Sequence, residues 1–87
     1  MKIPHFYIDE INEIIKCIDT LDAGDLFLAY RRLLFIEQMF EGYEVPLKDE
    51  NYDRLISVRI HAECLLIRKL AEYEVLKMRV ECYETKA

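Results

Sequence analysis

The stretch ENYDRLISVRIHAECLLIRKLAEYEVLKMRVECYE, residues 50–84, contains neither glycine nor proline. Its apolar residues recur at intervals of three and four, which is the spacing of a helix face. At 1.5 Å per residue, the stretch predicts one helix about 50 Å long. Three possible ion pairs four residues apart support the helical register: Arg59 with Glu63, Arg68 with Glu72, and Lys77 with Glu81.

Two apolar stripes lie on nearly opposite faces of this predicted helix, separated by charged ridges. The first stripe consists of Leu55, Val58, Ala62, Leu65, Leu66, Tyr73, Leu76, Val80 and Tyr83. The second stripe consists of Ile56, Ile60, Cys64, Ile67, Ala71, Val75, Met78 and Cys82. Small and medium side chains dominate the second stripe, and its 11-residue period predicts a nearly straight face that another helix can approach closely.

Two shorter helices are predicted before the long one, over residues 4–21 and 25–41. The first has an apolar stripe made of Ile8, Ile11, Ile15, Ile18 and Leu21, and the second has one made of Leu26, Ala29, Leu33, Ile36 and Phe40. The second helix is apolar over most of its circumference, so we expect it to be buried on more than one side. The predicted fold is all-α, a single domain over residues 1–87, in which the two short helices form a hairpin packed on the long C-terminal helix.

Turn and capping residues mark the breaks between these helices. Gly24 can take a left-handed conformation in the first break, where Asp22 or Asp25 can cap the second helix. Asp49 or Asn51 can cap the long helix after the second break.

The long helix is too long for the rest of the chain to cover. A compact 87-residue chain has a radius of gyration near 12 Å. The two short helices, side by side, can cover one face of the long helix over half its length, and end to end they could cover one face along all of it. Neither arrangement covers both faces throughout. An uncovered apolar band marks an interface, so we predict a homo-oligomer, most simply an antiparallel or crossed dimer, joined through the second stripe. The alternative is a monomer in which the short helices clamp the long helix from both sides.

Composition excludes several functional classes. The chain has 12 Lys and Arg against 17 Asp and Glu, a net charge of −5, which disfavours nucleic acid as a partner. No apolar run reaches the roughly 20 residues of a membrane span. Cys64 and Cys82 would lie about 27 Å apart on one helix, too far for an intrachain disulfide. Reduced cysteines predict a cytoplasmic location.

Few side chains are arranged for chemistry. His61 and Cys64 could supply half of a metal site, but the chain offers no second matching pair, so neither a metal nor another cofactor is predicted. Phosphate-binding loops and nucleophile motifs are lacking, which argues against an enzyme. Four residues remain as possible contacts for a partner or an anionic ligand: Arg31, Arg32, Tyr43 and Tyr52. The arginines could instead pair with Glu10 or Glu13.

These features favour binding over catalysis. The sequence predicts a small non-enzymatic interaction module that self-associates through its long helix and binds another protein. Secretion chaperones and inhibitors carried by phages or mobile elements share this profile of short, acidic, helical chains, which is an analogy of type. The alternative is an oligomer that sequesters a small anionic ligand, such as a nucleotide, in a pocket between subunits.

Overall fold

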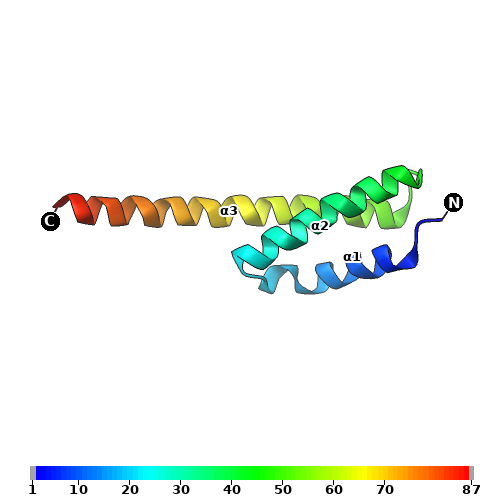
Figure 1. The fold of residues 1–87 in the computed structure, drawn as a ribbon, viewed down its shortest axis with the longest axis horizontal. Helices are drawn as coiled ribbons and strands as arrows, with labels where there is room; N and C mark the ends of the chain where they lie inside the picture. Colours follow the sequence, from blue (N-terminus) through cyan, green and yellow to red (C-terminus); the bar gives the residue numbers. More distant parts are fainter. Residues whose placement is uncertain (1, 87) are drawn as a thin grey trace.

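The computed structural model describes the backbone of residues 2–86 and the side chains of residues 2–79. It contains helix α1 (His5–Cys17), a 3₁₀ turn η1 (Ile18–Thr20), helix α2 (Ala23–Gly42) and helix α3 (Glu50–Lys86). Residues 2–86 contain no β-strand. The predicted fold of three helices is confirmed, and α1 and α2 form a hairpin alongside α3 (Figure 1).

The helix ends show which capping residues act. Asp22 caps α2, because its carboxylate accepts a hydrogen bond of 2.8 Å from the backbone N–H of Asp25. Asp49 caps α3 in the same way, accepting from the N–H groups of Asn51 at 2.8 Å and Tyr52 at 3.3 Å. Gly24 does not take the left-handed conformation that is open to glycine. With Asp22 as the cap, Gly24 already belongs to the first turn of α2 and has a negative φ.

The first helix ends earlier than predicted. Helix α1 stops at Cys17, and the chain tightens into η1 before the break. The hydroxyl of Thr20 donates a hydrogen bond of 2.7 Å to the Cys17 carbonyl, which satisfies one of the acceptors left free at the helix end. Ile18 in this turn is buried, so the tightened segment still contributes to the core.

The core forms where the hairpin meets the first half of α3. From α3 it takes the beginning of the first stripe, and Leu55 and Ala62 are fully buried. From α1, η1 and α2 it takes Tyr7, Ile11, Ile14, Ile18, Leu26, Leu33, Ile36 and Phe40. The predicted stripe of α2 is confirmed, since its remaining member, Ala29, is packed against this cluster. On α1, Ile14 is buried, whereas the predicted Ile15 lies at the edge of the core.

Helix α2 is covered on one side only. Phe27 and Leu28 are more than half exposed, and Leu34 and Phe35 are exposed as well. The expectation that this helix is buried on more than one side is therefore wrong for the single chain. Helix α2 makes most of its contacts with α3 and few with α1, so the remaining face of α2 is open.

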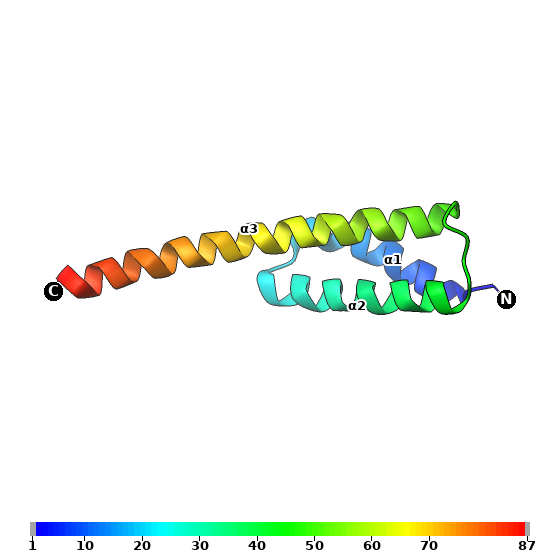
Figure 2. The ribbon, with the colours of Figure 1, turned by 90° about the horizontal axis from the view of Figure 1, so that it is seen from above.

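The second half of α3 extends alone beyond the hairpin. Both views show α1 and α2 beside the N-terminal half of α3, with the C-terminal half projecting past them (Figures 1 and 2). We call residues 67–86 of α3 the rod. The molecule measures 64 × 19 × 16 Å, and its radius of gyration is 17.3 Å, against about 12 Å for a compact chain of this length. The hairpin thus covers one face of α3 over half its length.

Core and rod leucines should respond differently to truncation. We expect Leu55→Ala to lower the free energy of unfolding by about 2–5 kcal/mol, because Leu55 is fully buried and leaves a cavity. The matched control, Leu70→Ala, removes a leucine that is mostly exposed and should change stability by about 0.5 kcal/mol or less. Urea denaturation followed by circular dichroism measures both. Equal losses would mean that the rod belongs to the folded core.

Candidate protein-interaction surface

The second stripe of α3 is uncovered by its own chain. Of its described members, only Ile56 is half-buried; Ile60, Cys64, Ile67, Ala71, Val75 and Met78 are exposed. Ile67 is 66% exposed and Met78 is 63% exposed. The side chain of Cys82 lies outside the described residues. The hairpin packs on the opposite face, so these apolar side chains meet none of the hairpin core.

The first stripe also becomes uncovered once the hairpin ends. Leu65 and Leu66 are half-buried against the core, but Tyr73 and Leu76, further along, are about 60% exposed. Leu70 beside them is equally exposed. The rod is therefore apolar on both sides over its described part, as the two stripes predict.

A half-open pocket forms where the hairpin ends and the rod begins. Its volume is about 520 Å³. The walls are almost wholly apolar and come from the start of α2 and the middle of α3, namely Ala23, Phe27, Tyr30, Leu66, Lys69, Leu70 and Tyr73. A concave apolar site of this size can take large side chains from another molecule. Its position depends on where α2 begins along α3, which no sequence pattern specifies, so sequence reasoning missed it.

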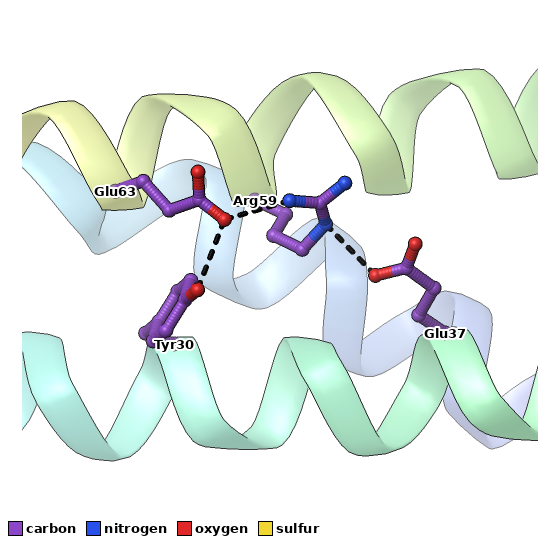
Figure 3. A network of polar contacts seen from close by, with 4 residues as sticks. All are labelled: Tyr30, Glu37, Arg59 and Glu63. Atoms are coloured by element: carbon purple, nitrogen blue, oxygen red, sulfur yellow. Dashed lines mark hydrogen bonds and ion pairs between the residues drawn. The ribbon is translucent and has the colours of Figure 1, made fainter.

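A polar network fastens α2 to α3 next to this pocket. The Tyr30 hydroxyl donates a hydrogen bond of 2.9 Å to Glu63, and Arg59 donates one of 2.7 Å to the same carboxylate oxygen (Figure 3). On its other side Arg59 forms an ion pair with Glu37, with 2.8 Å between Nε and the carboxylate oxygen. The expected pair of Arg59 with Glu63 is confirmed. The tyrosine and Glu37 were not foreseen as members of this network.

Hydrogen bonding within this network shifts the pKa values of Glu63 and Tyr30 in opposite directions. The bond from Tyr30, followed by the bond from Arg59, lowers the pKa of Glu63, because both stabilise the carboxylate. The same bond to Glu63 raises the pKa of Tyr30, since ionisation of the phenol would break it. The network is therefore strongest when the carboxylate is charged and the phenol is neutral.

The four residues predicted as possible ligand contacts do not form one site within the chain. Arg32 donates a hydrogen bond to Glu10 of α1 and lies 4.7 Å from the centre of the Phe35 ring. Tyr43 follows the last residue of α2, 11 residues after Arg32, or about 16 Å by helical rise. This contact agrees with the alternative that Arg32 pairs with Glu10 of the first helix instead of binding a ligand. A ligand pocket between subunits stays a prediction.

Tyr52, Tyr43 and Arg31 have separate surroundings. Tyr52 packs against Phe40, with 5.9 Å between ring centres, and belongs to the edge of the core. Tyr43 lines a cleft of about 500 Å³ between the N-terminal segment and the loop that joins α2 to α3. Arg31 is exposed on α2. Of the four residues, Arg31 and Arg32 are exposed, whereas Tyr43 and Tyr52 are half-buried.

The described residues hold no group of three or more side chains arranged to bind a metal ion. His61 instead lies 2.8 Å from a carboxylate oxygen of Asp19 in η1. Over the described part of the chain, no helix combines the length and apolarity needed to cross a membrane. Comparison with known protein families, curated proteins and solved structures finds no match.

The lowered pKa of Glu63 predicts how stability depends on pH. As the pH falls, the unfolded chain takes up a proton at Glu63 before the folded chain does. The stabilisation is therefore present above about pH 4.3, the ordinary pKa of glutamate, and is lost as the pH falls below it. We expect the wild type to lose more free energy of unfolding between about pH 6 and about pH 3 than Glu63→Gln.

Urea denaturation at both pH values measures this difference. Tyr30→Phe is the control, because it removes the hydrogen bond that contributes most to the shift while keeping the ring in place. Its pH dependence should lie between those of the wild type and Glu63→Gln. Identical pH dependence in all three proteins would show that Glu63 is not stabilised by the network.

Proposed function

We propose that the chain is a small non-enzymatic interaction module that self-associates through the second stripe of α3 and binds another protein. The observation that carries this proposal is the exposure of the second stripe along the whole described length of the rod. An apolar band of this extent on a short chain is typical of an interface.

The size of the apolar surface fits a reversible association. Ile60, Ile67, Val75 and Met78 are between 49% and 66% exposed. Burying the exposed part of each supplies about 1 kcal/mol, or about 8 kcal/mol over two copies, before the smaller residues contribute. The cost of association is of the same order, about 4–15 kcal/mol. We therefore infer a dimer whose population depends on concentration.

The opposite side of the rod supports the second half of the proposal. The pocket beside Phe27 and Leu70, together with the exposed part of the first stripe, is a concave apolar surface that self-association through the second stripe leaves open. It is suited to apolar side chains of a different protein. An adaptor, a chaperone-like subunit or an inhibitor of the phage or mobile-element type would use such a site. The free Cys17 and Cys64 are consistent with a reducing cytoplasm.

A charge on the second stripe should dissociate the assembly. We expect Ile67→Glu to yield a monomer of 10.5 kDa at micromolar concentration, because two copies would bury the new carboxylate without a partner. Its helicity should be retained, since Ile67 is mostly exposed in the single chain. Sedimentation equilibrium measures the mass, and circular dichroism measures the helicity.

The matched control is Leu76→Glu, which places the same charge on the opposite side of the rod at a similarly exposed leucine. It should leave the mass of the assembly unchanged. A wild type that stays at 10.5 kDa at all accessible concentrations would refute self-association. Dissociation by Leu76→Glu alone would assign the interface to the first stripe.

Partner binding should depend on the pocket instead. We expect a protein captured from the native host by the wild type to be lost with Leu70→Glu, because this change puts a charge into the apolar pocket wall. Ile67→Glu should still capture that protein as a monomer, since its charge lies outside the pocket. Quantitative mass spectrometry of the bound fractions compares the variants. Equal capture by wild type and Leu70→Glu would exclude the pocket as the binding site.

A further inference from the structure

We propose that the second stripe receives a second copy of this chain in antiparallel orientation, with Ala71 of the two copies in contact at the two-fold axis. This inference rests on the proposed self-association and specifies its partner and register. It follows from three properties of the described surface, which are the order of side-chain sizes along the stripe, the position of two unpaired charges and the distribution of net charge along the chain.

The side chains of the second stripe match in size about Ala71. In an antiparallel pair, residues at equal distances on either side of the centre face each other. Ile67 then faces Val75 of the second copy, and Cys64 faces Met78, so larger side chains meet smaller ones. Ala71 at the centre allows the two backbones to approach closely. The six exposed members of the stripe would all be covered in this arrangement.

The charges beside the stripe are compatible with this register. Arg68 and Glu72 lie on the same ridge, and neither forms an ion pair with a described side chain, although their spacing predicts a pair between them. In an antiparallel pair related by a two-fold axis, each charged ridge of one helix lies beside the equivalent ridge of the other helix. Centring on Ala71 brings Arg68 within two residues of Glu72 of the second copy along the axis, about 3 Å, and repeats the pair by symmetry.

A neighbouring register gives a worse match. Centring two residues earlier, on Lys69, would also align much of the stripe. It would place Cys64 level with Glu74 of the second copy, and Val75 level with Glu63, so neither would have a member of the stripe opposite it. Centring on Ala71 places Cys64 level with Met78 and Val75 level with Ile67, which all belong to the stripe. The earlier register therefore leaves two members of the stripe without an apolar partner, which disfavours it.

Net charge along the chain favours the antiparallel orientation. Residues 1–67 carry 13 Asp and Glu against seven Lys and Arg, a formal charge of −6, whereas residues 68–87 carry four acids and five bases. A parallel pair would place the two acidic hairpin ends side by side. The antiparallel pair places residues 75–86 of each copy along residues 56–67 of the other, so the acidic ends lie apart. Electrostatic complementarity of this kind sets orientation.

Disulfide trapping tests the central contact. In a chain with Cys17, Cys64 and Cys82 replaced by Ser, Ala71→Cys should form a cross-linked dimer under mild oxidation, because the two introduced thiols face each other across the two-fold axis. Tyr73→Cys in the same background is the control, since Tyr73 is also exposed but lies on the far side of the rod. It should remain largely uncross-linked. Non-reducing electrophoresis measures the dimer fraction.

Charge exchange tests the edge contact independently. Arg68→Glu and Glu72→Arg should each weaken dimerisation by about tenfold, because each creates two like-charge contacts by symmetry. The double variant R68E/E72R should restore it to within about twofold of the wild type. Sedimentation equilibrium gives the dissociation constants. Both positions are exposed, and circular dichroism verifies that the variants fold.

The outcomes separate this inference from the function on which it rests. Efficient cross-linking at position 71 together with restored affinity in the double variant supports the register. If the wild type is dimeric but cross-linking occurs at position 73 and not at 71, or the double exchange restores nothing, the register is overturned and self-association stands. A wild type that is monomeric at every concentration overturns both.

Discussion

The packing of α2 against the first half of α3 is the interaction on which the rest of the molecule depends. Helix α2 has 20 residues and α3 has 37, so one cannot shelter the other along its whole length. Leu26, Leu33, Ile36 and Phe40 bury the first stripe only as far as the hairpin extends. Everything distinctive about the surface, including the bare rod and the pocket at its base, follows from this difference in length.

The network around Arg59 determines where this packing stops. Apolar contacts between two helices tolerate small sliding movements, because they have little directionality. Hydrogen bonds and ion pairs do not, since they require particular atoms at short range. By joining Tyr30 and Glu37 of α2 to Arg59 and Glu63 of α3, the network fixes the axial position of α2. It therefore also fixes where the pocket lies and how much of α3 is left bare.

Sequence patterns predicted the helices well because their signals are local. Long runs without glycine or proline, capping aspartates and apolar spacing each act within a few residues, so three helices and the two apolar stripes of α3 could be foreseen. Where a tertiary contact decides which side chain is buried, the sequence pattern is insufficient. Ile14 and Ile15 are both apolar, and only the approach of the neighbouring helices selects Ile14 for the core. Likewise, the burial expected for α2 on more than one side came from composition alone, and Phe27 lies exposed. The partners of Arg59 across the interface and the pocket depend on the same unpredicted alignment of α2 on α3.

The elongated outline has a hydrodynamic consequence. A particle measuring 64 × 19 × 16 Å experiences more friction than a sphere of equal mass, so it diffuses and sediments more slowly. A single chain of 10.5 kDa would consequently elute from a sizing column ahead of compact proteins of its own mass. Its apparent Stokes radius would imitate that of a larger globular species, even with one subunit per particle.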